Sequence, residues 1–169
     1  MELLLGCGRS RTKYLVLADR PAAWEDLTTL DHEATHSPDV VHDLNNPVLP
    51  FASDLFDEIH AYEVLEHLGT QGDWRFFFKQ FSEFWRVLRP GGIMCGTVPL
   101  PTSIWAWGDP SHTRVLPRTA FMFLAQRFYD QVGKTNCSDF RSCYHADFDV
   151  FYLKDAGESL QFGLRAVKT

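Results

Sequence analysis

The chain has 169 residues, of which 45% are hydrophobic and 14% aromatic, and this is enough for one packed domain spanning residues 1–169. Its apolar runs are only a few residues long and its N-terminus lacks a basic segment, which argues against a membrane span and a signal peptide. The formal net charge of −6 disfavours nucleic acid as a partner, because affinity for the phosphate backbone comes from Lys and Arg.

The four cysteines, at positions 7, 95, 137 and 143, lack the paired spacing of a zinc site or a disulfide framework. This pattern suits a reducing compartment and predicts a cytoplasmic protein. A small basic cluster at Arg9, Arg11 and Lys13 is interpreted as a solvated loop in preference to a nucleic-acid patch.

Short apolar segments that end at turn or acidic residues predict four strands in the first sixty residues. They are Glu2–Leu5 before Gly6-Cys7-Gly8, Leu27–Leu30 before Asp31, Val40-Val41 before His42-Asp43, and Phe56–Ala61. The first connection, residues 9–26, is polar and interrupted by proline, and it shows no convincing helical pattern.

The second half contains the clearest helix, Asp73–Leu88, where large apolar residues recur at steps of three and four. They are Trp74, Phe77, Phe78, Phe81, Trp85 and Leu88; Asp73 is a suitable N-cap, and Arg89-Pro90-Gly91-Gly92 is expected to end the helix. After this helix the sequence predicts a strand at Ile93–Val98, a loop over 99–116, a helix at Arg118–Phe128 and a hairpin of Phe148–Lys154 with Leu160–Val167. The pattern predicts an α/β fold, a Rossmann-like, mostly parallel sheet with a C-terminal antiparallel hairpin.

The turn Gly6-Cys7-Gly8 follows the first strand, where ligands of open α/β sheets bind. A third glycine expected for a nicotinamide site would stand at Arg11, so that cofactor is disfavoured. Asp31, at the end of the second strand, can accept both hydroxyls of a ribose, and Asp43, after the third, can accept a hydrogen bond from an adenine amino group.

A set of ordered landmarks resembles the class I SAM-dependent methyltransferases (SAM, S-adenosylmethionine). They are Leu-Leu-Leu-Gly-Cys-Gly at 3–8, Asp-Val-Val-His-Asp-Leu at 39–44, Leu-Pro-Phe at 49–51, Phe-Asp-Glu-Ile at 56–59, Glu-Val-Leu-Glu-His-Leu at 63–68 and Phe-Trp-Arg-Val-Leu-Arg-Pro-Gly-Gly at 84–92. The resemblance covers about residues 2–100 and implies a seven-stranded sheet with SAM lying over the glycine turn.

The resemblance also implies which residues contact the cofactor. These are the turn Gly6, Cys7 and Gly8, then Asp31 for the ribose, Asp43 and Leu44 for the adenine, and Ala61, Tyr62 and Glu63 beside the methionine end. The expected reaction is attack of an unidentified acceptor on the sulfonium methyl, with His112 and Glu63 as candidate bases.

Two departures from the family pattern weaken the expected contacts with the methionine end of SAM. Leu4 stands where the family has an acid, and Ser10 stands where the turn has its third glycine. The chain also starts at the first strand, without the usual preceding helix. A trimmed domain, a domain that binds SAM without transferring a methyl group, and a fold completed in a homodimer are therefore alternatives.

The sequence His32-Glu33-Ala34-Thr35-His36 fits the HExxH pattern of zinc metalloproteases. That chemistry requires a helix, so that both imidazoles share one face. Because Pro38 closes the motif and no amphipathic helix surrounds it, the protease is the less favoured alternative.

Glu63, Glu66 and His67 are spaced to share one helix face. The pattern is similar to that of magnesium-dependent O-methyltransferases, in which a histidine after the fifth strand completes the site, here His112. Two histidines weaken the case for magnesium, which prefers oxygen ligands, and metal-free chemistry is favoured. The nearby Trp105 and Trp107 are expected either to stack on an acceptor or to plug the sheet.

Overall fold

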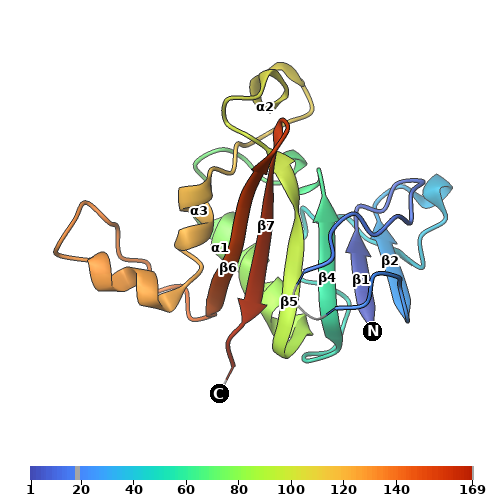
Figure 1. Ribbon diagram of the computed structural model, residues 1–169, viewed down its shortest axis with the longest axis horizontal. Coiled ribbons are helices and arrows are strands. Elements are labelled where there is room, and N and C mark those ends of the chain that lie inside the picture. Colours follow the sequence, from blue (N-terminus) through green and yellow to red (C-terminus); the bar gives the residue numbers. More distant parts are fainter. Residues whose placement is uncertain (18–19, 169) are drawn as a thin grey trace.

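A computed structural model describes residues 1–17 and 20–168 and shows one seven-stranded sheet in the order β3-β2-β1-β4-β5-β7-β6 (Figure 1). The strands are β1 (Glu2–Leu5), β2 (Leu27–Asp31), β3 (Val40–Val41), β4 (Phe56–Tyr62), β5 (Leu88–Pro99), β6 (Phe148–Ala156) and β7 (Ser159–Ala166). The helices are α1 (Trp74–Val87), α2 (Ile104–Gly108) and α3 (Arg118–Met122), with 3-10 turns at η1 (Ala34–His36), η2 (Leu65–His67) and η3 (Gln126–Gln131).

The five strands β1 to β5 run parallel, and β7 pairs antiparallel with both β5 and β6. The predicted Rossmann-like sheet with a C-terminal antiparallel hairpin is therefore confirmed. Because β1 pairs with both β2 and β4, the carboxyl ends of these three strands meet at one edge of the sheet. We call this the carboxyl edge.

Helix α1 begins as the sequence predicts and ends differently. The Asp73 side chain accepts a hydrogen bond from the Phe76 amide at 3.0 Å. The helix packs Phe78, Phe81 and Phe84 into the core, whereas Trp74 remains exposed. The residues Arg89-Pro90-Gly91-Gly92, which were expected only to end the helix, belong to β5. This strand begins at Leu88, directly after α1.

The helix expected over residues 118–128 is broken. Only α3 is α-helical, and Ala125 is extended before the 3-10 turn η3. The carbonyls of Phe123 and Leu124 accept hydrogen bonds from the Tyr129 hydroxyl and the Phe148 amide, at 2.9 and 3.0 Å. Tertiary hydrogen bonds thus replace the helical ones. The loop expected over residues 99–116 also contains the short helix α2.

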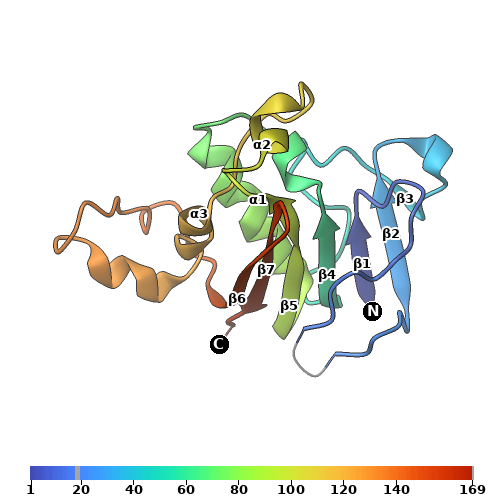
Figure 2. The same ribbon diagram turned by 45° about the horizontal axis from the view of Figure 1, so that its top comes forward.

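The two faces of the sheet are covered differently. Helices α1 and α3 lie against one face, and residues 9–17 and 20–26 cross the other face as an extended segment (Figures 1 and 2). We call this segment the strap. Within its described residues the strap has no helix, as the sequence indicated. No helix in the described part of the chain has the length and apolar character needed to cross a membrane.

Candidate active site

A cavity of about 530 Å³ opens at the carboxyl edge. It is bordered by residues that follow β1, β2, β3 and β4: Gly6, Gly8, Asp31, His32, His36, His42, Asp43, Leu44, Asn45, Glu63, Val64, His67 and Leu68, together with Ser111. This set contains six of the residues that the sequence assigns to the cofactor: Gly6, Gly8, Asp31, Asp43, Leu44 and Glu63.

The glycine turn needs glycine for two separate reasons. Gly6 has φ +55°, and a Cβ atom there would lie 2.6 Å from a methyl group of Val64. Gly8 has φ +50° and faces open space, and its amide donates to Asp31 Oδ2 at 2.8 Å. The first glycine therefore permits close packing, and the second leaves the backbone open to a ligand.

Asp31 is a buried carboxylate at the end of β2. Its Oδ1 atom accepts from the Glu33 amide at 2.9 Å, and the Nδ1 atom of His36 lies 3.3 Å from the same oxygen. Burial alone would raise the pKa of Asp31, but hydrogen bonds from the Glu33 and Gly8 amides outweigh it and hold the pKa below the ordinary value. The carboxylate is therefore ionised, with a fixed orientation, at the wall of the cavity.

Asp43 and Leu44 also border this cavity. The Asp43 Oδ1 atom accepts from the backbone and side-chain amides of Asn45, at 2.8 and 3.1 Å, which fixes the turn after β3. Leu44 is buried and contributes apolar surface to the cavity.

Cys7 and Tyr62 are not among the residues that border the cavity. Cys7 is buried, and its thiol lies 3.5 Å from the Gly8 carbonyl. Tyr62 projects to the strap face of the sheet, where its hydroxyl accepts from the Leu15 amide at 3.1 Å and lies 2.7 Å from His60 Nδ1. The alternation of side chains along β4 explains this placement.

Glu63, Glu66 and His67 do not share a helix face, and this prediction is wrong. Glu63 has φ +52° and precedes a 3-10 turn of three residues, η2. Its Oε1 atom accepts a hydrogen bond of 2.9 Å from the Ser159 hydroxyl at the start of β7. The left-handed backbone at Glu63 thus turns this side chain away from the direction that a helix would give it.

Glu66, His67 and His112 converge, with one ligand atom of each within 4.8 Å of the others. The His112 Nε2 atom lies 4.0 Å from Glu66 Oε1, and the two imidazole rings meet edge to face at 4.6 Å. Burial raises the pKa of Glu66 to about 8. Two hydrogen bonds bring His112 here: the Thr113 amide donates to the Glu66 carbonyl at 2.8 Å, and His67 Nδ1 lies 3.2 Å from the Ser111 carbonyl.

The HExxH sequence has no helix of the kind a metalloprotease needs. Glu33 instead caps the 3-10 turn η1 by accepting from the Thr35 amide at 3.0 Å. The two imidazoles flank Asp31, with Nδ1 atoms 3.3 and 3.5 Å from its Oδ1 atom. Sequence reasoning therefore missed His32 and His36 as cavity residues, although their position directly after Asp31 was a usable signal.

Trp105 and Trp107 do not plug the sheet. Their side chains are 58% and 70% exposed on α2, and the Trp107 indole donates to the Pro101 carbonyl at 2.9 Å. Helix α2 projects beyond the carboxyl edge (Figures 1 and 2). Its N-cap Ser103 donates to Glu158 in the β6–β7 turn at 2.9 Å.

The cavity thus lies at the carboxyl edge of a Rossmann-like sheet, with two acids beside a glycine turn, which is where open α/β sheets bind their ligands. A family model described as a methyltransferase domain matches residues 3–96, more than half of the chain. The chain therefore belongs to this family of SAM-dependent methyltransferases, and the acceptor of the methyl group is unidentified. No curated protein matches the sequence.

Several solved structures share the fold. A SAM-dependent methyltransferase from Archaeoglobus fulgidus is 13% identical with a TM-score of 0.55, covering 99% of this chain and 85% of that one. A SAM-dependent methyltransferase from Methanosarcina mazei is 12% identical with a TM-score of 0.58, covering 99% and 92%. The [4+2]-cyclase SpnF is 14% identical with a TM-score of 0.60, covering 99% and 74%. At these identities the likeness concerns the fold alone.

Proposed function

We propose that the cavity at the carboxyl edge binds SAM and that the chain transfers its methyl group to an acceptor at the Glu63 side of this cavity. The single observation that supports the proposal is the convergence of Gly8, Asp31 and Asp43 on one cavity. These residues lie at or just after the carboxyl ends of three different strands, and the sequence assigns all three to the same ligand.

The adenosine half of SAM fits the residues present. Asp31 offers an ionised carboxylate to the ribose hydroxyls, and Asp43 retains an oxygen for the adenine amino group beside the apolar Leu44. The open backbone at Gly8 allows the ligand to approach closely.

The methionine half has fewer charged partners in this chain. Leu4, at the position of the family's acid, is buried in β1 and does not border the cavity. The extended strap replaces the helix that would begin after the glycine turn. Glu63 is the acid that borders this end of the cavity, so we assign it to the ammonium group of the methionine or to the acceptor.

SAM supplies an activated methyl group when it is bound, so the residues of the chain have to orient the acceptor and remove a proton from it. Of the two candidate bases, Glu63 is exposed and borders the cavity, whereas His112 lies behind His67 and does not border it. We therefore propose Glu63 as the base and His112 as a residue that positions His67.

A titration with S-adenosylhomocysteine, followed by calorimetry, tests cofactor binding. Asp31→Asn is expected to weaken binding by about tenfold or more, because a hydrogen bond to a charged group contributes roughly 1.5–3 kcal/mol. Asp155→Asn, in the exposed β6–β7 region, is the matched control and should leave the affinity unchanged. Equal affinities for the wild type and Asp31→Asn would contradict the proposed site.

A screen of small molecules, nucleic acids and proteins as methyl acceptors tests transfer itself. Glu63→Gln should lower the turnover number by about 100-fold, the usual contribution of a positioned base. If the chain binds S-adenosylhomocysteine tightly and transfers no methyl group in any arm of the screen, it is a SAM-binding domain without transferase activity.

We propose residues 1–169 as a single functional domain. One sheet runs through the described residues from β3 to β6, and one large hydrophobic cluster joins β1 to β7. The cavity and the Glu66–His67–His112 cluster both depend on this sheet, so we expect no smaller fragment to bind the cofactor.

A further inference from the structure

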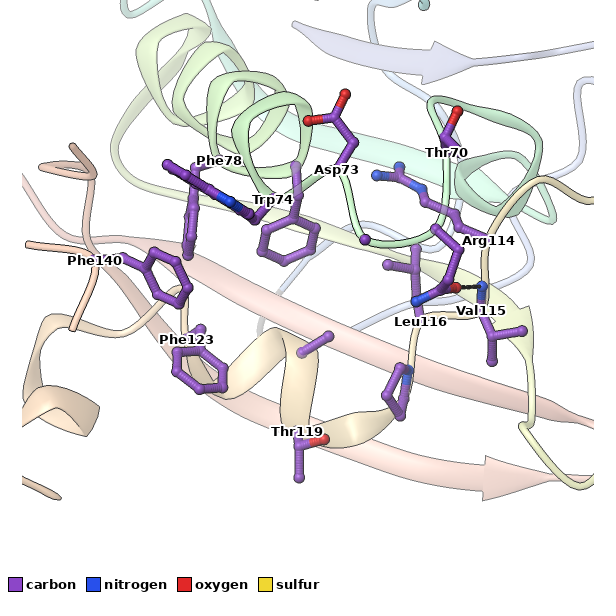
Figure 3. Close-up of a pocket in the computed structure, with 15 residues that line it drawn as sticks. Thr70, Asp73, Trp74, Phe78, Arg114, Val115, Leu116, Thr119, Phe123 and Phe140 are labelled. Carbon is purple, nitrogen blue, oxygen red and sulfur yellow. Dashed lines mark hydrogen bonds between the residues drawn. The ribbon is translucent and has the colours of Figure 1, made fainter. Parts of the chain in front are cut away.

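A second cavity, of about 280 Å³, lies between the start of α1 and α3 (Figure 3). Aromatic rings border it at one end: the ring of Phe140 lies 4.8 Å from that of Phe78 and 5.8 Å from that of Phe123, between centroids. Among the described residues, none borders both this cavity and the one at the carboxyl edge. Aromatic surfaces around a cavity of this size suit a small planar molecule.

Arg114 borders the other end of this cavity and is only 5% exposed (Figure 3). Its Nε atom donates to the Leu65 carbonyl at 2.8 Å, and its Nη2 atom donates to the side-chain oxygen of Gln80 at 2.6 Å. Within residues 1–17 and 20–168, Nη1 donates to no protein atom, and no carboxylate forms an ion pair with this guanidinium within 4.0 Å. Buried charges are normally paired, so this cation requires a partner.

The neighbouring carboxyl groups do not supply that partner. Burial lowers the pKa of Arg114 to about 10, so the guanidinium is charged at neutral pH, and Glu66 and Asp73 oppose this shift only from beyond 4.0 Å. The Oδ1 atom of Asp73 caps α1 by accepting from the Phe76 amide at 3.0 Å. Glu66 has its pKa raised by burial to about 8, so it is mostly protonated at neutral pH.

The second cavity adjoins the proposed cofactor site without sharing its residues. Segments 66–71 and 113–115 are held together by hydrogen bonds from the Gln71 amide to the Thr113 carbonyl at 3.0 Å and from the Val115 amide to the Gln71 side chain at 2.7 Å. Gln71 and Val115 border the second cavity, whereas His67 borders the first. A ligand in the second cavity would therefore not contact the residues assigned to SAM.

We propose that the second cavity binds a small aromatic carboxylate, with its ring against Phe78, Phe123 and Phe140 and its carboxylate at Arg114 Nη1. An uncharged ring would leave the buried guanidinium unpaired, and an ammonium group would place a second cation beside it. Helix α1 begins at this end of the cavity, and the positive end of its dipole also favours a negative charge. The site does not rest on the proposed function.

The experiment titrates the full chain with three molecules that share one ring system and differ in charge, and follows binding by calorimetry. They are naphthylacetate, naphthylethanol and naphthylethylamine. One naphthylacetate per chain is expected, with an affinity about tenfold or more above that of the alcohol, because the hydrogen bond to a charged group is made only by the anion. The amine should bind most weakly.

Three variants locate the site. Arg114→Met should weaken naphthylacetate binding by about tenfold or more and leave naphthylethanol binding unchanged, so that the preference for the anion is lost. Arg118→Met is the matched control, because this exposed arginine pairs with Asp155 and does not border the cavity. Ala120→Phe places a ring at the border of the cavity and should weaken the binding of all three molecules.

Absence of naphthylacetate binding at millimolar concentration, equal wild-type affinities for the anion and the alcohol, or a preference for the anion retained in Arg114→Met would overturn the proposal. Circular dichroism shows whether Arg114→Met folds. If it does not, Ala120→Phe decides, because unchanged naphthylacetate binding in that variant would exclude this cavity. Its affinity for S-adenosylhomocysteine should equal that of the wild type, and a parallel loss would contradict the separation of the two sites.

Discussion

The helical face and the strap face of the sheet are stabilised by different kinds of contact. On the helical face, aromatic side chains fill the core: Phe81 contacts Phe84 and Phe121, and Phe121 stacks on Phe162 with centroids 4.7 Å apart. On the strap face, Lys13 lies buried between Glu2 and Glu58, with Nζ–O distances of 3.2 and 3.1 Å.

The difference follows from the backbone of the covering segment. A helix satisfies its own amides, whereas an extended strap must find acceptors elsewhere. The sheet supplies them through polar side chains: Glu2 accepts from the amides of Glu25 and Asp26 at 3.0 and 2.9 Å, and the Tyr62 hydroxyl accepts from the Leu15 amide. On this face a buried polar network therefore stands beside a smaller hydrophobic cluster, in which Leu15 and Leu17 of the strap pack on Ile93 and Cys95 of β5.

His60 completes this network. Its Nε2 atom lies 2.9 Å from Glu58, its Nδ1 atom lies near the Tyr62 hydroxyl, and the Trp24 ring packs edge to face on the imidazole. Burial lowers the pKa of His60 and keeps the ring neutral. Burial would raise the pKa of Glu58, but hydrogen bonds from His60 and Lys13 outweigh it and lower that pKa.

The largest expected effect is on the helical face. Phe81→Ala should reduce the free energy of unfolding by about 4 kcal/mol, because it leaves a cavity in a closed aromatic core. Urea unfolding measures the change. Lys79→Ala, on the exposed side of the same helix, is the control and should change stability by less than about 0.5 kcal/mol.

Removal of the buried ammonium group of Lys13 should have the next largest effect on stability. Lys13→Met keeps the apolar stem but leaves two buried carboxylates without their shared cation, at a cost of about 3 kcal/mol in urea unfolding. The double variant Lys13→Met/Glu58→Gln should recover part of this loss. A single variant as stable as the wild type would show that hydrophobic contact alone stabilises the strap.

The pH dependence of stability should distinguish the two faces. Glu2 and Glu58 have lowered pKa values in the folded chain, so their contribution is complete above the ordinary value of 4.5 and is lost as the pH falls through the folded values. The melting temperature should therefore fall below pH 4.5, and the fall should be smaller in Lys13→Met/Glu58→Gln. Identical profiles for the wild type and this variant would contradict the assigned pKa directions.

The smallest expected effect is on the outer side of the strap. Val16 is 45% exposed there, and Val16→Thr should change the free energy of unfolding by less than about 0.5 kcal/mol. Leu17→Ala, on the buried side of the same strap, should cost about 2–3 kcal/mol. Similar losses for both variants in urea unfolding would mean that the strap packs in another register.

The sequence by itself determined the approximate strands, the mostly parallel sheet with its antiparallel hairpin, and the position of the glycine turn relative to Asp31 and Asp43. These features depend on short apolar segments and on the residues that follow them, which are local properties of the chain. The start of α1 directly after Asp73 was predictable for the same reason, because a cap is a local hydrogen bond.

Only the tertiary structure decided the direction of Glu63 and the meeting of Glu66 with His112. Each depends on a partner distant in sequence: Ser159 for Glu63, and the Thr113 amide for the segment that carries His112. Spacing along the chain does not encode such contacts. In addition, the left-handed backbone at Glu63 and the 3-10 turn η2 replace the expected helix, so the spacing of Glu63, Glu66 and His67 no longer places their side chains on one face.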